Sequence, residues 1–270
     1  MILFPNAKIN LGLHILSKRE DNYHNIDTLM YPLDFCDILE FLPSPGTETT
    51  LSLSGIPVSG NLSENLVYKA YLLLEKKFHL PQLRIHLHKM IPPGAGLGGG
   101  SSDAAHMLKG LNQMFGLALN NIELKDYSSE LGSDCSFFID NVPSFATGKG
   151  EILRKALNYL ENVKIALLFP GFKVSTAEAY QGITPEPDKR SLISILESGL
   201  YNWKKLLKND FETNIFAKHP VLSEIKSKLY ENGAIYASMS GSGSAVYGLF
   251  EKNYILPPEL QKFLIGRISV

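Results

Sequence analysis

A glycine-rich segment at 93–105, with the sequence PGAGLGGGSSDAA, is the strongest constraint on the fold of this chain. Its five glycines lie between an alternating pattern at 83–88, typical of a strand, and a helical apolar stripe at 102–115. Glycine reaches backbone conformations closed to other residues and approaches a ligand without a clash at Cβ. A helix start adds free N–H groups and a partial positive charge. The segment therefore predicts a cradle for the phosphates of a nucleotide.

The cradle is expected to use the whole segment rather than single residues. The hydroxyls of Ser101 and Ser102 suit a phosphate or a bound magnesium ion, although one of them could instead cap the helix. A flexible Gly/Ser linker is disfavoured because the segment lies within a strand–helix unit. The residues expected to contact ATP here are Pro93, Gly94, Ala95, Gly96, Leu97, Gly98, Gly99, Gly100, Ser101, Ser102 and Asp103.

Other phosphate-binding patterns fit this segment less well. Gly94, Gly96 and Gly99 satisfy G-x-G-x-x-G, but a dinucleotide site needs a second strand that ends in an acidic residue about 20 positions on. Here 119–124 leads into a helical pattern instead. A P-loop needs a lysine after its glycines, and protein kinases need further catalytic motifs, neither of which the sequence contains.

Composition and charge narrow the class of protein. A length of 270 residues favours two domains, at roughly 150 residues each. A formal net charge of -1 gives no general attraction for nucleic acid or anionic lipid. No apolar run reaches the roughly 20 residues that span a bilayer, and residues 1–8 lack a signal leader, so we expect a cytoplasmic protein. Cys36 and Cys135 are too few for a disulfide framework and lack the spacing of a zinc site.

Periodicity predicts the remaining elements. Alternation at 8–15 predicts a half-buried strand whose polar face carries Lys8 and Asn10, and 65–77 reads as a helix capped by Ser63. We place the domain boundary near residue 155, which gives domains at 1–155 and 156–270. Further strands are expected at 37–41, 51–60, 163–169, 234–239 and 245–250, a hairpin at 144–153, and further helices at 122–131, 191–207 and 221–232.

The glycine segment resembles the phosphate loop of the GHMP kinases, the family of galactokinase, homoserine kinase and mevalonate kinase. The resemblance spans nearly the whole chain and implies a two-domain α+β fold, with an N-terminal ribosomal-protein-S5-like nucleotide-binding domain and a C-terminal ferredoxin-like α/β sandwich. The further matching blocks, in the family's order, are AKINLGL at 7–13, YH at 23–24, DTL at 27–29, LGSD at 131–134, TGKGE at 147–151, NDFE at 209–212 and MSGSGS at 239–244.

The resemblance implies that Lys8 and Asp134 are the catalytic residues. Asp134 would orient or deprotonate the acceptor hydroxyl, while Lys8 would keep Asp134 ionised and stabilise phosphate charge. An ordinary aspartate pKa near 3.9 makes a weak base, so orientation and electrostatics are expected to dominate. From the residues alone, an Asp after Gly-Ser is equally consistent with a helix cap, and a strand lysine with a solvated side chain.

Within the GHMP kinases, these blocks most resemble those of members that act on a cytidine-diphosphate acceptor. The resemblance therefore implies the substrate 4-diphosphocytidyl-2-C-methyl-D-erythritol, whose 2-hydroxyl is phosphorylated in non-mevalonate isoprenoid biosynthesis. Tyr23 and Tyr180 would stack on the two faces of its cytosine ring. His24 and Asn10 would read polar groups, with Thr176 nearby. Without the resemblance, both tyrosines would be read as ordinary core or surface aromatics.

The resemblance also assigns the adenine end and a closing turn. Asn65 and Lys89 would flank the adenine, although a helix-start residue and a solvated lysine are the simpler interpretations. The turn at Gly241, Ser242 and Gly243 would close over the phosphate loop and the substrate, although a plain hairpin would look the same.

Some positions depart from the family pattern or allow another reading. Asn22 stands where Gly is common before Tyr-His, and Cys135 and Ser136 replace an apolar-Pro pair, so the local loop geometry is expected to differ from the family's at these two places. His86 and His88 share one strand face and suggest a metal site, but the sequence offers no third ligand.

The expected function is therefore that of a kinase that uses ATP with Mg²⁺ to phosphorylate a small-molecule alcohol. Ser101 and Asp134 are candidates for holding the ion. One alternative is another GHMP kinase, such as a homoserine or sugar kinase, which would not need the Tyr23-His24 block. A second is a nucleotide-binding regulator without catalysis, which the intact Lys8 and Asp134 disfavour. The sequence gives no indication of oligomeric state.

Overall fold

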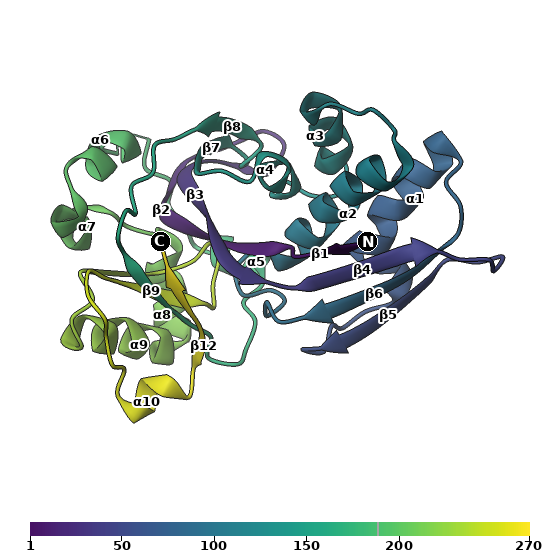
Figure 1. Cartoon of the computed structure of the whole chain (residues 1–270). Coiled ribbons are helices and arrows are strands. Elements are labelled where there is room, and N and C mark those ends of the chain that lie inside the picture. The colour runs from purple at the N-terminus through teal and green to yellow at the C-terminus, as the bar shows by residue number, and fades with distance from the viewer. Residues whose placement is uncertain (188) are drawn as a thin grey trace. The chain divides into compact units, whose positions relative to one another are not determined.

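A computed structural model describes residues 1–187 and 189–270, shown in Figure 1. Contacts group these residues into two units, each made of three stretches of sequence. Among the residues described, no helix is both long enough and apolar enough to cross a bilayer. The domain boundary near residue 155 stays a prediction. Unit 1 comprises Met1–Lys8, Pro32–Pro93 and Gly98–Val142, and unit 2 comprises Ile9–Tyr31, Gly94–Leu97 and Pro143–Val270.

Unit 1 contains a four-stranded sheet in the order β1-β4-β6-β5. Leu39 pairs with Leu87, and Phe41 with Ile85, which places four buried apolar side chains on one face. Helix α2 covers this face, since a Cβ at Gly110 would lie 2.7 Å from the Phe41 ring. The strands are β1 (Ile2–Leu3), β4 (Ile38–Pro43), β5 (Thr50–Gly55) and β6 (Leu83–Lys89), with β5 parallel to β6 and the other neighbours antiparallel.

The opposite face of this sheet carries His86 and His88. His86 forms hydrogen bonds with Ser52 Oγ at 2.8 Å and Ser54 Oγ at 2.9 Å, and His88 Nδ1 lies 2.9 Å from Ser54 Oγ. No group of three or more His, Cys, Asp or Glu side chains with a metal-binding arrangement occurs within residues 1–187 and 189–270. The histidine pair therefore belongs to a polar ladder with serines.

The helices of unit 1 begin where side chains or glycines supply the cap. Asn65 Oδ1 accepts a hydrogen bond from Val67 N–H at 2.9 Å, so the first helix is capped by Asn65 rather than by the expected Ser63. Asn120 and Glu123 form a capping box at the start of helix α3 (Asn121–Ser129). The helical elements are η1 (Leu62–Glu64), α1 (Leu66–Phe78), α2 (Gly99–Phe115), α3 (Asn121–Ser129) and α4 (Cys135–Asp140).

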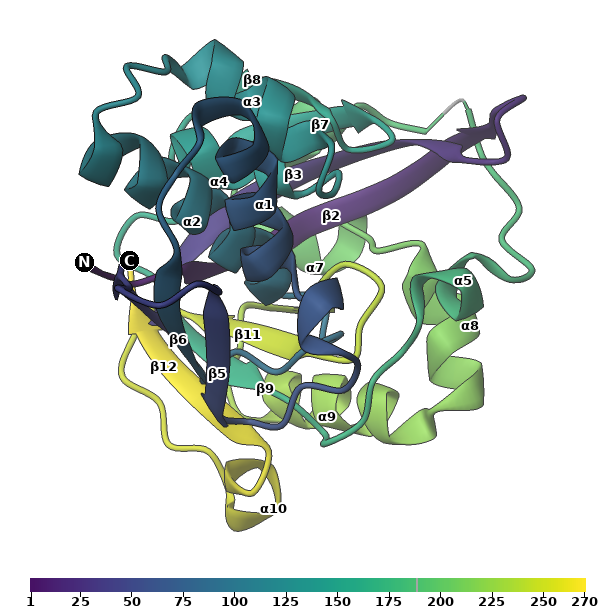
Figure 2. The same ribbon diagram turned by 90° about the vertical axis from the view of Figure 1, so that its right-hand side faces the viewer.

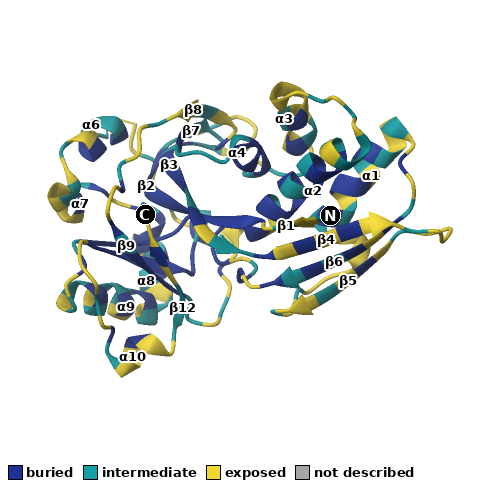
Figure 3. Cartoon of the chain, viewed as in Figure 1, coloured by how far each residue is buried: buried dark blue, intermediate teal, exposed yellow. Residues whose placement is uncertain are grey.

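A second sheet has the order β2-β3-β7-β8. Every position from 6 to 15 in its first strand is buried, so the expectation of a half-buried strand was wrong. Figure 3 draws most of this strand, labelled β2, in dark blue. The buried Lys8 and Asn10 must therefore find polar partners inside the protein. The hairpin expected at 144–153 is confirmed. The strands are β2 (Asn6–Lys18), β3 (His24–Cys36), β7 (Ser144–Gly148) and β8 (Ile152–Lys155).

The third sheet belongs to unit 2, is antiparallel throughout and has the order β10-β11-β9-β12. Figure 2 shows α9 lying along it, and a Cβ at Gly248 would lie 2.9 Å from Leu229 of that helix. The single helix expected at 191–207 is instead two, because Gly199 with φ +92° separates them. The strands are β9 (Lys164–Leu168), β10 (Tyr236–Met239), β11 (Val246–Phe250) and β12 (Leu264–Ser269); the helices are α5 (Thr176–Tyr180), α6 (Leu192–Glu197), α7 (Leu200–Leu206), α8 (Phe211–Lys218), α9 (Pro220–Glu231) and α10 (Pro258–Gln261).

Candidate functional site

The first part of the glycine segment, Gly94–Leu97, lies in unit 2 against the turn between β10 and β11. Ser240 Oγ donates to the Gly96 carbonyl at 2.8 Å, and Ala245 N–H donates to the Ala95 carbonyl at 3.0 Å. Gly96 has φ +77°, and a Cβ there would lie 2.0 Å from the Ser240 carbonyl oxygen. Only glycine fits this approach. The serine- and glycine-rich turn at 240–245 therefore holds this part of the loop directly.

The second part of the segment opens helix α2 in unit 1. The helix begins at Gly99, earlier than the expected Ser102, and Gly98 with φ +72° is its N-cap residue. Neither serine is therefore the cap. Ser102 N–H closes the first intrahelical hydrogen bond, to the Gly98 carbonyl at 2.9 Å. The N–H groups of Gly99, Gly100 and Ser101 precede that bond and form the helix end at which an anion is favoured.

Lys8 and Asp134 form an ion pair beside this helix start. Lys8 Nζ lies 3.4 Å from Asp134 Oδ2, and the two side chains are 4% and 31% exposed. The aspartate is therefore accessible to a ligand, and the lysine is not a solvated side chain. Asp134 holds the N-cap position of α4 but makes no capping hydrogen bond within the described part of the chain. A Cβ at Gly98 would lie 3.1 Å from Lys8 Cγ, which places the pair next to the glycine loop.

Ser101 and Cys135 approach the same place from α2 and α4. The two side chains are hydrogen-bonded to each other, and burial raises the pKa of the Cys135 thiol to about 11. Cys135 is therefore a neutral thiol at physiological pH, and it follows Asp134 directly in the chain. This departure from the family pattern fills a buried position without adding charge to the site.

A cavity of about 180 Å³ lies in unit 1 between helices α1 and α2 and strand β6. Asn65 and Lys89, expected beside adenine, line it together with Pro93, Gly100 and Asp103 of the glycine segment. Apolar walls with a few polar groups suit a flat heteroaromatic ring. The sequence did not single out the apolar walls, because leucines in periodic patterns look like ordinary core; those walls include Leu53, Leu62, Leu66 and Leu87.

Lys89 is held by two buried carboxylates at the edge of this cavity. Its Nζ forms ion pairs with Asp37 and, at 2.6 Å, with Asp103. Asp37 Oδ1 also accepts hydrogen bonds from the N–H groups of Met90 at 2.6 Å and Ile91 at 2.8 Å. Burial raises the pKa of Asp103 to about 8, against the opposing effect of Lys89. Lys89 is thus no solvated strand-end residue, and Asp37 is a partner that sequence reasoning missed.

In unit 2, the structure brings Asn10 next to the turn at 240–243. Asn10 Nδ2 donates to Thr28 Oγ1 at 3.0 Å, and the Asn10 carbonyl accepts from the Tyr247 hydroxyl at 2.8 Å. A Cβ at Gly241 would lie 3.2 Å from Asn10 Oδ1. Ser242 and Gly243, with φ +88° at Gly243, complete the turn. Two of the expected substrate-binding elements therefore adjoin each other within this unit.

The aromatic residues of the expected acceptor site are also in unit 2. His24 and Tyr180 stack with ring centroids 4.6 Å apart and an interplanar angle of 17°. Tyr23 is 59% exposed, and Lys149 Nζ lies 4.8 Å from the centre of its ring. Thr176 opens α5, the helix that ends at Tyr180. The structure thus stacks Tyr180 on His24, while the role of Tyr23 and Tyr180 as two faces of a sandwich stays a prediction.

Comparison with known proteins shows the family to which the chain belongs. Its residues 65–149 match the GHMP kinases N terminal domain, and residues 191–256 match the GHMP kinases C terminal model. The 4-diphosphocytidyl-2-C-methyl-D-erythritol kinase of Bacteroides thetaiotaomicron is 52% identical over 95% of this chain and 94% of its own length. The chain belongs to the 4-diphosphocytidyl-2-C-methyl-D-erythritol kinase family. The resemblance read from the sequence blocks is therefore confirmed, and members of this family are GHMP kinases that use ATP as phosphate donor.

Solved structures agree with this family assignment. A crystal structure of 4-(cytidine 5'-diphospho)-2C-methyl-D-erythritol kinase matches with a TM-score of 0.78 at 33% identity, covering 92% of this chain and 90% of that one. Homoserine kinase from Cytophaga hutchinsonii matches with a TM-score of 0.66 at 16% identity, covering 95% and 87%, and shares the fold alone. The two-domain α+β GHMP kinase fold expected from the sequence is confirmed.

One histidine of the family's phosphate-loop helix makes stability depend on pH. His106 Nδ1 donates to the Ser102 carbonyl at 2.9 Å, and burial lowers the His106 pKa to about 4. The unfolded chain, with an ordinary histidine pKa near 6.5, binds the proton first as pH falls. The free energy of unfolding should therefore decrease by about 3 kcal/mol between about pH 6.5 and 4 on account of this residue.

Urea unfolding of the wild type and of His106→Gln at pH 7.5 and pH 5 checks this expectation. Both proteins lose stability on acidification for other reasons, but the loss should be smaller in His106→Gln. The comparison of the two proteins at pH 7.5 is the control, because the His106 ring is neutral at that pH in both the folded and the unfolded chain. Equal losses in the two proteins would show that His106 is not the group responsible.

Proposed function

We propose that this chain transfers the γ-phosphate of ATP to the 2-hydroxyl of 4-diphosphocytidyl-2-C-methyl-D-erythritol. The observation that carries the proposal is the Lys8 and Asp134 ion pair at the start of α2, with the aspartate accessible and the lysine buried. A reactive carboxylate beside a phosphate cradle is what a kinase for alcohols needs. Relatives that are 52% and 51% identical to this chain are named 4-diphosphocytidyl-2-C-methyl-D-erythritol kinase.

The proposed mechanism relies on position and charge. The N–H groups at the start of α2 hold the β- and γ-phosphates. Asp134 accepts a hydrogen bond from the acceptor hydroxyl and takes its proton as the new O–P bond forms and ADP leaves. Lys8, 3.4 Å from Asp134, pairs with that carboxylate and stabilises the charge that develops on the transferring group. Because an aspartate is a weak base, alignment of the hydroxyl contributes more than proton removal.

The donor set at this place fits Mg²⁺, which we propose as the second cofactor. Asp134 offers a carboxylate. Ser101 offers a hydroxyl, and its side chain is hydrogen-bonded to that of Cys135, the residue after Asp134. Mg²⁺ usually takes only one or two protein carboxylates and completes its shell with water and nucleotide phosphates. When bound, the ion supplies charge neutralisation of the phosphates. Ser101 and Asp134 are the residues that would hold it.

An assay with alternative acceptors tests the proposed function. ADP release from ATP should depend on the diphosphocytidyl alcohol and stay at the blank rate with homoserine or galactose. Release with homoserine or galactose instead would favour another GHMP kinase. Tight ATP binding without release on any acceptor would favour a regulator without catalysis. The domain division near residue 155 and the cytoplasmic location stay predictions from the sequence.

Recognition of the cytosine ring gives a second measurable effect. We propose that Tyr23 stacks on this ring, so Tyr23→Ala should raise the KM for the diphosphocytidyl substrate by about tenfold or more, since stacking on an aromatic side chain contributes about 1–3 kcal/mol per base. The KM for ATP should not change. Tyr23 is 59% exposed, so the fold should tolerate its removal.

Tyr23→Phe is the matched control for that measurement, because it keeps the ring and removes the hydroxyl. Its KM for the diphosphocytidyl substrate should stay near the wild-type value. An unchanged KM in Tyr23→Ala would contradict the stacking role. An equal rise in both variants would point to the hydroxyl as the contact.

A further inference from the structure

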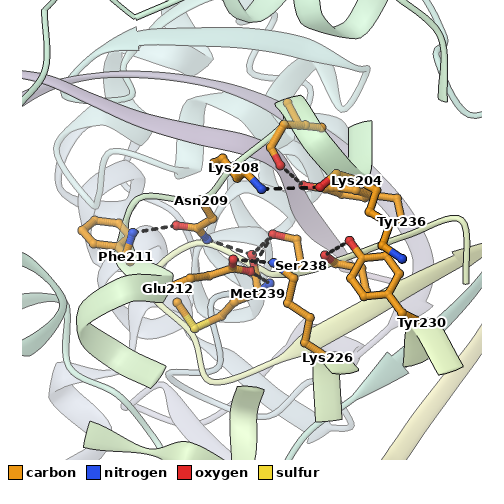
Figure 4. Close-up of polar contacts among 12 residues, drawn as sticks. Lys204, Lys208, Asn209, Phe211, Glu212, Lys226, Tyr230, Tyr236, Ser238 and Met239 are labelled. Carbon is orange, nitrogen blue, oxygen red and sulfur yellow. Dashed lines mark hydrogen bonds and ion pairs between the residues drawn. The ribbon is translucent and has the colours of Figure 1, made fainter. Parts of the chain in front are cut away.

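The block at 209–212 has no part in the mechanism above, yet two of its polar side chains, those of Asn209 and Glu212, are buried. Asn209 is 3% exposed and Glu212 is 8% exposed. Buried amides and carboxylates destabilise a protein unless they are hydrogen-bonded. Figure 4 shows both side chains directed at the same short stretch of chain, the end of strand β10.

Asn209 uses its whole side-chain amide at this place. Its Nδ2 donates to the Met239 carbonyl at 2.8 Å and to the Gly241 carbonyl at 2.9 Å. Its Oδ1 accepts from Phe211 N–H at 3.0 Å, which fixes which end of the amide faces the carbonyls. Main-chain bonds also hold Asn209 in place, since Lys208 and Asp210, on either side of it, both pair with Leu13 of β2 at 2.9 Å.

Glu212 binds the same strand end through its carboxylate. Its Oε1 accepts from Met239 N–H at 2.8 Å and from Ser238 Oγ at 3.0 Å, as the dashed lines in Figure 4 mark. Its Oε2 pairs with Lys226 Nζ at 2.5 Å. Each carboxylate oxygen therefore has a donor, and charge-assisted hydrogen bonds of this kind are stronger than neutral ones.

The position of β10 explains why two side chains are used. In its sheet β10 is the edge strand, with β11 on its other side. The N–H and C=O groups of one strand residue point to the same side, and those of Met239 face away from β11, where the described part of the chain places no further strand of this sheet. Glu212 takes the N–H and Asn209 takes the C=O. Together they act in place of a missing strand up to Gly241.

The chain beyond Met239 belongs to the site described above. Ser240 Oγ donates to the Gly96 carbonyl at 2.8 Å, and Gly241 adjoins Asn10. Gly243 N–H bonds to the Ser240 carbonyl at 2.9 Å, and Ala245 N–H to the Ala95 carbonyl at 3.0 Å. Where the Gly241 carbonyl lies therefore decides where the turn and the loop segment Gly94–Leu97 lie.

We infer that Asn209 and Glu212 are positioning residues that hold the turn at 241–243 in its binding geometry. They act through the backbone of Met239 and Gly241 and do not touch the acceptor themselves. The part of this inference that concerns substrate rests on the proposed function, because that proposal gives the turn its binding role. The part that concerns the turn's own geometry does not.

Asn209→Asp is the sharpest variant, because it keeps the shape and replaces the donating Nδ2 with an oxygen that faces two carbonyls. Hydrogen–deuterium exchange, measured without any substrate, should become about tenfold faster or more at the amides of Gly243 and Ala245, since their local protection depends on the turn. The KM for the diphosphocytidyl substrate should rise by a similar factor.

Tyr230→Phe is the matched control. The Tyr230 hydroxyl donates to the Ala237 carbonyl at 3.1 Å, so this variant also removes a hydrogen bond to β10, but at a residue four positions before Gly241. Its exchange at Gly243 and Ala245 and its KM should stay at wild-type values, although its overall stability falls. If Asn209→Asp does not fold, Asn209→Ala removes the donors without adding repulsion and serves the same comparison.

The exchange measurement and the KM measurement distinguish a failure of this inference from a failure of the proposed function. Unchanged exchange and KM in a folded Asn209 variant would overturn the inference, and so would equal changes in Tyr230→Phe, which would mean a general loss of stability. If the wild type itself shows no turnover of the diphosphocytidyl substrate, the proposed function fails, and the exchange comparison still decides whether Asn209 holds the turn.

Discussion

Replacing Asp134 with Asn is expected to lower kcat by about a thousandfold while ATP binding changes little. The substitution keeps the size of the side chain but removes the charge that aligns the acceptor hydroxyl and takes its proton. A positioned acid–base group contributes about 10²–10⁴-fold. It also leaves the buried Lys8 without the carboxylate that lies 3.4 Å from it. Steady-state ADP release gives kcat, and calorimetric titration with ATP gives the nucleotide affinity.

Asp140→Asn is the control for this experiment. Asp140 is also on α4 and pairs with Lys125 at 2.6 Å, so the variant removes a comparable ion pair from the same helix. Its kcat should stay within about twofold of the wild type, as expected for a partly exposed pair. Near wild-type turnover in Asp134→Asn would remove Asp134 from the mechanism. Loss of ATP binding there would instead assign Asp134 chiefly to holding the nucleotide with its Mg²⁺.

Lys89→Met should produce the largest loss of stability, about 3–5 kcal/mol in the free energy of unfolding, because it leaves buried carboxylates without their cation. Asp37 is 0% exposed, and Asp103 is 2% exposed. Burial already raises the pKa of Asp103, and removing Lys89 takes away the cation that opposes this rise. Urea unfolding followed by circular dichroism measures the change.

Lys125→Met provides the comparison. It deletes the same charge from a pair of the same length, 2.6 Å, but the Lys125 side chain is 32% exposed. Partly exposed pairs contribute little, so its cost should stay below about 1 kcal/mol. Similar losses in the two variants would mean that burial does not decide the energy at Lys89.

Local sequence signals located many of the elements but not their partners. Apolar periodicity found the helix that became α1, and turn residues found the hairpin β7–β8, because both signals depend on residues close in the chain. The strand expected at 8–15 was predicted to be half-buried, since alternation does not reveal that both of its faces are covered. The split at Gly199 was missed because a single glycine within a helical pattern is often tolerated.

The site shows the same limit. The glycine segment predicted that a helix follows it, although that helix begins at Gly99 rather than Ser102 and has Gly98 as its N-cap. Lys8 and Asp134 are paired across more than a hundred residues, and only the resemblance indicated that they meet. Asp37 was missed because its partner Lys89 lies 52 residues away. A single sequence carries no signal for such long-range pairs. The contacts of Asn209 and Glu212 belong to the same class.

The strand order of the third sheet also affects how the chain is made. β9 lies between β11 and β12, so its partners leave the ribosome only as synthesis proceeds from Leu168 to Ser269. At about 5–20 residues per second, roughly 4–16 seconds pass between the synthesis of Leu168 and that of Phe250, the end of β11, and both edges of β9 are unpaired during that time. Unit 1 has all of its residues by Val142 and does not wait. The nascent chain is therefore most open to chaperones, and to mispairing with other chains, after its first unit is complete.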